Sequence, residues 1–300
     1  MDRVVVLMGV KNGEQYLSQQ LRSIAWQRGV DWRLIVSDDG SVDGSCEIIG
    51  EFSKAHAGRV TYMRGPETGL ASNYLYLLQE CQPNCYVALA DQDDIWLPGK
   101  LIRAIEMLSK DADKAAIYSG SSYVLAPSNV VKGAEEEQLY PSFGNALVQN
   151  ILAGHSIVMT PRALSLANEI QPSEPPPFHD WWLYALFSGM NCNILCDRKP
   201  QVLYRQHSEA SLGANIGIMA RLKRMRLIGD GTYRQWLREH HAALLSVARE
   251  LPAENRRLLE DFTGAHLTGL SVRSMLKGQV RRQSVSASLV MSIAIASGIV

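Results

Sequence analysis

The chain has 300 residues, 46% of them hydrophobic, and its formal net charge is zero. This length and apolar content suffice for one large domain with an appended region, and they exclude a disordered chain. The charge is unevenly placed, because residues 221–282 carry thirteen Lys or Arg against six Asp or Glu. An acidic body with a basic tail argues against a dedicated nucleic-acid-binding protein and fits a catalytic domain joined to a basic region.

The two ends of the chain bear on its location. Asp2 and Arg3 precede the short apolar run Val4 to Met8, which does not resemble a secretory signal. The five cysteines are an odd number and lack zinc or redox spacing, so we expect reduced thiols and a cytoplasmic location. The apolar run 285–300 is shorter than a usual membrane span. We expect a packed helix there, or one lying at the inner face of the cell membrane.

Short apolar strands alternate with helices over the first 119 residues. The strands are predicted at 4–10, 32–37, 60–63, 86–90 and 115–119. The helices between them are predicted at 14–26, 45–56, 72–81 and 101–109. This alternation predicts an α/β fold with a mostly parallel, Rossmann-like sheet flanked by helices. Ligands of such folds bind at the carboxyl ends of the strands, so polar residues that follow strands become the candidate site.

The later part of the chain changes in character. Residues 128–140 form a polar excursion with three consecutive glutamates, and the proline-rich run 171–177 breaks the chain. Beyond residue 220 the sequence is basic and helical in pattern. We therefore predict a catalytic domain over 1–217 and a helical appendage over 218–300. The appendage combines basic and apolar residues, which suits peripheral contact with a membrane.

Two acidic clusters follow predicted strands. Asp38 and Asp39 follow the second strand, where adjacent carboxylates can accept hydrogen bonds from a base or a ribose, or simply cap a helix. Asp91, Asp93 and Asp94 lie directly after the fourth strand. Carboxylates this close repel one another, and a divalent cation among them lowers that cost. Hard oxygen ligands favour Mn²⁺ or Mg²⁺.

Seven ordered motifs together resemble the family-2 glycosyltransferases of the GT-A fold, and most of all their rhamnosyltransferase-like members. The motifs are Val5 to Gly13, Ser37 to Ser41, Gly65 to Asn73, Asp91 to Leu101, Gly154, His179 to Trp182, and Tyr204 to His207. The resemblance covers about residues 3–215. It implies an inverting transfer of one sugar, from dTDP-rhamnose or a UDP-sugar, onto a hydroxyl of a saccharide or lipid-linked acceptor in cell-surface polysaccharide or glycolipid synthesis.

The same resemblance implies a role for each matching residue. Asp180 corresponds to the catalytic base, and Asp93 with His207 corresponds to the metal site. The residues expected to bind the donor are Val10, Asn12, Asp38, Asp39, Gly69, Asn73, Asp91, Gln92 and Arg205. Those expected on the acceptor side are Gly154, His155, His179, Trp181 and Trp182, with core packing an equal alternative for the two tryptophans. A carboxylate base suits this chemistry, because the acceptor hydroxyl must lose its proton as it attacks.

Three other functions fit parts of the pattern. A nicotinamide-dependent oxidoreductase needs a Gly-x-Gly-x-x-Gly turn after the first strand, which residues 9–13 do not supply. A metal-dependent phosphatase with an Asp-x-Asp motif usually carries it on the first strand, not the fourth. A catalytically inactive binding module of the same fold is the main alternative. It would be favoured by loss of Asp93, Asp180 or His207, and all three are present.

Overall fold

The computed structural model describes residues 1–126, 128, 130–133, 139–207, 226–227, 229–263 and 269–297. The first half alternates strands and helices as the sequence predicts. Its elements are β1 (Asp2–Val10), α1 (Glu14–Ala25), β2 (Val30–Asp38), α2 (Ser45–Ala55), β3 (Val60–Arg64), α3 (Leu70–Glu80), β4 (Tyr86–Ala90), β5 (Ile95–Trp96) and α4 (Lys100–Leu108). Strand β1 is buried from Val4 to Val10 because helices cover both faces of the sheet.

The second half of the catalytic region mixes strand directions. Its elements are η1 (Ser109–Asp111), β6 (Ala116–Leu125), β7 (Val131–Lys132), α5 (Phe143–Ala146), η2 (Gly154–Ser156), β8 (Ile157–Met159), α6 (Pro161–Glu169), α7 (His179–Gly189) and β9 (Asn193–Arg205). The C-terminal region contributes α9 (Thr232–Ser246), η3 (Ala248–Glu250), α10 (Ala253–Thr263), α11 (Gly269–Leu276) and α12 (Val285–Ala296).

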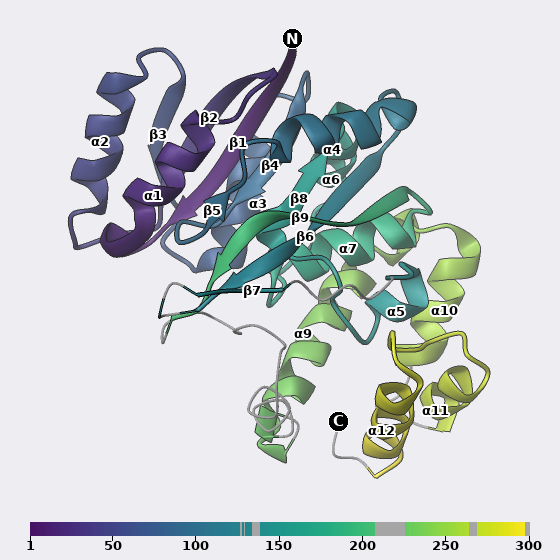
Figure 1. The fold of residues 1–300 in the computed structure, drawn as a ribbon. Coiled ribbons are helices and arrows are strands. Elements are labelled where there is room, and N and C mark those ends of the chain that lie inside the picture. Colours follow the sequence, from purple (N-terminus) through teal and green to yellow (C-terminus); the bar gives the residue numbers. More distant parts are fainter. Residues whose placement is uncertain are drawn as a thin grey trace.

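One sheet joins these strands in the order β3-β2-β1-β4-β8-β6-β9-β5, with β7 added beside β6 (Figure 1). Strands β1 to β4 are mutually parallel, and β6 pairs with β9 in parallel. Strands β8 and β5 run antiparallel to their neighbours. The sheet is therefore mixed with a parallel majority, which confirms the predicted α/β class.

Two apolar cores fill the opposite faces of the sheet. One lies beneath α1, α2 and α4 and the other beneath α3, α6 and α7. Helices α9, α10 and α12 add Leu244, Phe262 and Met291, among others, to the second core. The C-terminal helices thus pack against the α/β body on the side of α7. The predicted domain boundary near Gly217 and the glutamates 135–137 lie outside the described residues.

Candidate active site

Parallel strands bring the candidate residues to one edge of the sheet. In the register of β1 with β2, Val10 lies opposite Asp38, and in that of β1 with β4, Met8 lies opposite Ala90. The loops that follow β1, β2 and β4 therefore begin at nearly the same level. This is the strand edge at which α/β proteins bind ligands.

The loops after β1 and β2 are tied together by side chains expected to bind the donor. The amide oxygen of Asn12 accepts a hydrogen bond from the Val42 N–H at 2.9 Å, and the Asn12 N–H donates to the Ser41 hydroxyl oxygen at 2.9 Å. The Ser41 hydroxyl donates in turn to the Asp38 carboxylate. Val10 is buried, and its carbonyl accepts from the Asp39 N–H at 2.8 Å. Asn12 has a φ of 49°, which asparagine tolerates better than most residues.

Asp39 orders the loop between β3 and α3. Its two carboxylate oxygens accept hydrogen bonds from the N–H groups of Glu67, at 2.6 Å, and Gly69, at 3.1 Å. Gly69 has a φ of 106°, a backbone region open mainly to glycine. The amide of Asn73 is buried and exchanges hydrogen bonds with Ser37 at the end of β2. These residues shape the proposed donor loops from within.

Gln92 joins the acidic loop after β4 to the loop after β1. Its side-chain oxygen accepts from the Lys11 N–H at 2.9 Å, and its side-chain nitrogen donates to the Lys11 carbonyl at 3.0 Å. The Gln92 side chain also packs against Gly13. A Cβ at residue 13 would lie 2.5 Å from the Gln92 side-chain oxygen, so a larger residue does not fit there. The two loops are therefore held at a fixed separation.

The acidic cluster gathers a histidine from a distant part of the chain. The Nε2 atom of His207 lies 2.7 Å from a carboxylate oxygen of Asp93, although 114 positions separate them. The hydroxyl of Tyr74 donates to the Asp91 carboxylate at 3.0 Å and to the Ala90 carbonyl at 2.6 Å. The structure thus brings together the two residues that the sequence analysis assigned to metal, next to Asp91, which it assigned to donor binding.

Arg205 supports this loop from the protein side. Its backbone N–H donates to the Asp94 carboxylate at 3.0 Å, and its Nε donates to the Asp93 carbonyl at 2.9 Å. Its Nη2 donates to the Gln19 side chain at 2.6 Å, and its guanidinium lies over the Tyr16 ring. The guanidinium is committed to these contacts and is buried. In the structure, Arg205 therefore orders the acidic loop, and its predicted role in donor binding stays a prediction.

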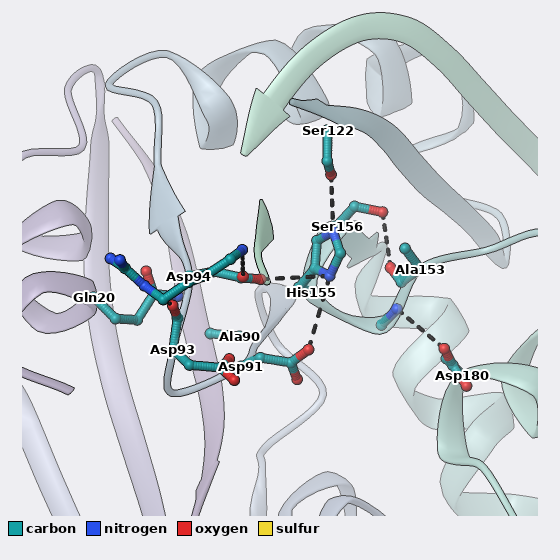
Figure 2. A network of polar contacts seen from close by, with 12 residues as sticks. Gln20, Ala90, Asp91, Asp93, Asp94, Ser122, Ala153, His155, Ser156 and Asp180 are labelled. Carbon is teal, nitrogen blue, oxygen red and sulfur yellow. Dashed lines mark hydrogen bonds and ion pairs between the residues drawn. The ribbon is translucent and has the colours of Figure 1, made fainter. Parts of the chain in front are cut away.

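His155 lies between two carboxylates and a serine (Figure 2). Its Nδ1 is 3.4 Å from Asp94 and 3.8 Å from Asp91, while its Nε2 is 2.8 Å from the Ser122 hydroxyl. The ring also stacks on Tyr204. Ligand atoms of Asp91, Asp94 and His155 all lie within 4.8 Å of one another, so this group could hold a metal ion. The sequence analysis placed His155 on the acceptor side, and the structure joins it to the acidic cluster as well.

Burial and mutual repulsion set the ionisation of the cluster. Burial raises the pKa of the Asp94 carboxyl to about 7, with repulsion from Asp91 and Asp93 adding to it. Burial, and then the charge of Asp91, raise the pKa of Asp93. Burial opposes ionisation of Asp91 too, but contact with His155 holds its pKa below the ordinary value. A cation near Asp93 would relieve this repulsion, as expected of a site that binds a divalent metal.

Two supporting residues were not singled out by the sequence analysis. Lys100 is fully buried, its Nζ has no hydrogen-bond partner among the described residues, and it lies 3.7 Å from the centre of the Trp96 ring. Burial lowers the pKa of Lys100 to about 7, although the charge of Asp94 opposes this shift. Lys100 belongs to the motif that begins at Asp91, and Tyr74 follows Asn73. Their places in and beside these two motifs are the sequence signal that identifies them.

Asp180 lies in the first turn of α7, on the other side of His155. One carboxylate oxygen accepts from the Gly154 N–H at 3.2 Å (Figure 2). The other accepts from the Trp181 N–H at 2.7 Å. The N-terminus of a helix favours a carboxylate because its free N–H groups point toward it. His179, the preceding residue, is buried and stacks on Tyr74. Burial lowers the pKa of His179, which favours a neutral ring.

The two tryptophans after Asp180 lie in the core. Trp181 is 3% exposed, stacks on His240 and donates from its indole N–H to the Ala146 carbonyl at 2.7 Å. Trp182 has no exposed surface. Their burial favours packing over direct contact with an acceptor, which was the alternative that the sequence left open. They hold the start of α7 and so the position of Asp180.

Comparison with known proteins identifies the class of protein. The sequence profile described as "Glycosyl transferase family 2" matches residues 5–158, just over half of the chain, and the chain belongs to this family. The protein is therefore a glycosyltransferase, as the ordered motifs imply.

Among characterised relatives, the dTDP-rhamnosyl transferase RfbG of Shigella flexneri is 26% identical over 95% of this chain and 100% of its own length. The glucosyltransferase WfgD of Escherichia coli, which uses UDP-Glc and a GlcNAc-diphosphoundecaprenol acceptor, is 26% identical over 71% of this chain and 80% of its own. The rhamnosyltransferase-like resemblance is thereby confirmed.

Solved structures confirm the fold. S. aureus TarS in complex with UDP-GlcNAc superposes with a TM-score of 0.60 and 15% identity, over 92% of this chain and 77% of that one. The mannosyltransferase PcManGT from Pyrobaculum calidifontis, in complex with GDP-Man and Mn²⁺, gives a TM-score of 0.55 and 15% identity, over 98% and 79%. In the described part of the chain, no helix combines the length and apolarity that crossing a bilayer requires.

Proposed function

We propose that this chain transfers one sugar from a nucleotide-diphosphate sugar to an acceptor hydroxyl, with inversion at the anomeric carbon. The observation that carries the proposal is one continuous network across the site. Asp93 contacts His207, Asp91 lies beside His155, and the Gly154 N–H that precedes His155 donates to Asp180. A metal-suited carboxylate cluster and a separate oriented carboxylate are the two parts that such a transfer needs.

The donor is proposed to carry dTDP or UDP, with dTDP-rhamnose first. The support is the full-length relation to RfbG, named for dTDP-rhamnosyl transfer, and the shorter relation to WfgD, named for UDP-Glc. We propose that the base and ribose contact the loops of Asn12, Asp38 and Asp39, and that the ribose reaches Asp91. Carboxylates at a strand end can accept the hydrogen bonds that base N–H and ribose O–H groups donate.

Asp93 and His207 are proposed to hold Mn²⁺ or Mg²⁺. The residues present fit such an ion, since a carboxylate oxygen and an imidazole nitrogen lie 2.7 Å apart beside two more carboxylates. Asp91 and Asp94 from this loop, with His155 from η2, form a second group of suitable ligand atoms. When bound, the cation would neutralise charge that develops on the diphosphate leaving group.

Asp180 is proposed to act as the general base. The acceptor oxygen bonds to the anomeric carbon, its proton passes to the Asp180 carboxylate, and the bond from that carbon to the diphosphate breaks with its electron pair leaving on the diphosphate. The N–H groups of Gly154 and Trp181 hold the carboxylate in place. With one base and no second carboxylate as nucleophile, a single displacement inverts the anomeric centre.

The acceptor is proposed to be a saccharide or lipid-linked sugar in cell-surface polysaccharide or glycolipid synthesis. A cytoplasmic enzyme that works at the inner face of the membrane suits such an acceptor, and contact through residues 218–300 would bring it there. The relation to WfgD, whose name contains a diphosphoundecaprenol acceptor, supports this class.

A donor screen tests the proposal. The full chain is incubated with dTDP-rhamnose, UDP-glucose and UDP-GlcNAc, each with Mn²⁺ or Mg²⁺ and a polysaccharide or glycolipid acceptor, and release of the nucleoside diphosphate is followed. We expect release with one donor, above the rate without acceptor. A donor that binds without any release across acceptors would favour the alternative of an inactive binding module.

A further inference from the structure

Helix α12 presents an apolar face to solvent. On one side, Met291, Ala294 and Ile295 are buried in the core beneath it. On the other, four large apolar side chains are 57–87% exposed, and they are Val285, Leu289, Val290 and Ile293. Residues four apart on a helix lie one above the other, so Val285, Leu289 and Ile293 form a continuous stripe. Contiguous exposed apolar residues of this kind mark interaction surfaces.

The surroundings of this stripe are basic. Residues 264–300 contain no Asp or Glu, and the exposed side chains of Arg273, Lys277 and Arg281 lie on α11 and on the connection to α12. Helix α11 packs against α12, and Leu276 near its end is 75% exposed. We call Leu276, Val285, Leu289, Val290 and Ile293 the C-terminal apolar face. Every charged side chain within the described residues 269–297, which carry this face, is basic.

The face is held firmly on the α/β body. The side-chain amide of Asn145 in α5 donates to the Arg281 carbonyl at 2.9 Å. Gln283 exchanges hydrogen bonds with Tyr140 at 2.9 and 3.0 Å, and the Ser284 hydroxyl caps α12. Figure 1 places α11 and α12 together at one end of the molecule, away from β1 to β3. The exposed stripe therefore belongs to a packed helix with a defined inner and outer side.

We propose that the C-terminal apolar face docks on the surface of an anionic lipid bilayer. The apolar stripe enters the boundary of headgroups and acyl chains, while Arg273, Lys277 and Arg281 meet anionic headgroups. Helix α12 has 12 residues, about 18 Å at 1.5 Å per residue, against a hydrocarbon core of about 30 Å. It therefore lies along the membrane surface and does not cross it.

Charge favours a bilayer over a second copy of this chain. A symmetric dimer through the face would bring the same three cations of each copy together, and like charges at an interface oppose association. Anionic lipid is the occupant that satisfies both the apolar stripe and its basic border. The inference deepens the proposed function, on whose lipid-linked acceptor it rests, by naming the surface that brings the enzyme to that acceptor.

Vesicle flotation of the full chain tests this surface. The probes are vesicles of phosphatidylcholine alone and of phosphatidylcholine with phosphatidylglycerol, at low and high salt. We expect flotation with the anionic vesicles that weakens with salt. The variants L289S/I293S and K277E/R281E should each reduce binding to anionic vesicles by roughly tenfold or more, because each removes one of the two contributions.

Controls make the result decisive. Trp26, 71% exposed at the end of α1, is replaced in W26S, which should bind vesicles as the wild type does. Folding of the double variants is checked by dTDP and UDP binding in solution, which the face does not touch. The inference is overturned if the wild-type chain does not bind anionic vesicles, or if folded L289S/I293S floats as the wild type does. It is also overturned if W26S loses as much binding as the double variants. A lipid-free dimer, seen by light scattering and dissociated in L289S/I293S, would assign the face to a second copy of the chain instead. Absent nucleotide binding in the wild type would instead count against the proposed function.

Discussion

The ring of His179 lies flat on the ring of Tyr74, with 3.8 Å between the centroids and 18° between the planes. Tyr74 donates to Asp91, and His179 directly precedes Asp180. The proposed base and the acidic cluster are thus joined through one buried aromatic contact. A change that moves His179 should disturb the acceptor side first, and Tyr74 is one route by which it could reach Asp91.

Gly154→Ala tests this coupling. A Cβ at residue 154 would lie 2.7 Å from His179 Nε2 and 3.5 Å from Asp180 Cβ, so the buried imidazole must shift. We expect turnover to fall about tenfold or more while nucleotide affinity changes little, with a stability loss of roughly 1–3 kcal/mol from overpacking. Steady-state kinetics, calorimetry with UDP or dTDP, and thermal unfolding measure the three quantities.

Gly50→Ala is the matched control for that substitution. Gly50 lies within α2, and a Cβ there meets no heavy atom within 4 Å. This variant should keep normal turnover, and the helix should gain a little stability from alanine. Unchanged kinetics in Gly154→Ala would mean that the position of His179 does not matter to Asp180.

Lys100→Met should change how stability depends on pH. The pKa of Lys100 in the folded chain is lowered to about 7 by burial, below its ordinary value of 10.5. Between these values the unfolded chain binds a proton that the folded chain does not, so stability rises with pH at up to about 1.4 kcal/mol per unit. The gain is complete above the unfolded pKa and is lost as the pH falls through about 7.

Methionine keeps the length of the side chain and removes the charge, so Lys100→Met should flatten this rise. Denaturant unfolding of both chains between pH 7 and 9.5 measures it. Near pH 7 the variant should be at least as stable as the wild type, because an unpaired buried ammonium is replaced by an apolar group. Parallel pH profiles in the two chains would show that Lys100 is not the titrating group.

The sequence predicted the first half of the fold closely because each element there carries its own local signal. Helix α1 was predicted at 14–26 and runs from Glu14 to Ala25, and β4 was predicted with its observed bounds. Strand β9 gave no such signal, since Asp197 to Pro200 interrupts its apolar pattern. Its pairing with β6, which includes a register shift, depends on contacts between segments far apart in the chain.

The candidate site residues could be predicted from the sequence, but the contacts that orient them could not. Asp91 and Asp93 could be found because they follow an apolar strand, and His207 and Asp180 through their motifs. The contacts that orient them could not be found, because each joins distant segments, as His155 does with Asp94 and Arg205 with Gln19. Periodicity reports which side of an element is buried, but it does not report the partner across a loop.

Asp93→Asn should make donor binding insensitive to divalent metal. Asparagine keeps the shape and removes the charge that a cation requires, so we expect weaker Mn²⁺-dependent UDP or dTDP affinity and lower turnover together. Calorimetry with Mn²⁺ and with chelator measures the difference. Asp31→Asn is the control, since Asp31 pairs at 3.8 Å with Arg3 and Arg59, away from the acidic loop. Metal-dependent binding that survives in Asp93→Asn would move the site to Asp91, Asp94 and His155.

Asp180→Asn should separate catalysis from binding. The carboxylate of Asp180 contacts only N–H donors of Gly154 and Trp181 among its described hydrogen bonds, and it makes none to the acidic cluster. Nucleotide affinity should therefore persist, with its metal dependence intact. Turnover should fall by roughly a hundredfold or more, as expected when a general base is lost.

The local geometry sharpens this last test. An asparagine can still accept from the Trp181 N–H through its oxygen, but its amide nitrogen would then face the Gly154 N–H, so a small shift of the loop accompanies the loss of basicity. Asp180→Glu separates the two effects, because it restores a carboxylate at the cost of position. Asp180→Glu should recover part of the turnover, and its turnover should again fall at acidic pH. That result would show that the side chain at residue 180 accepts the acceptor's proton. Near-normal transfer by Asp180→Asn would instead require another group, with His179 the nearest candidate on the same helix.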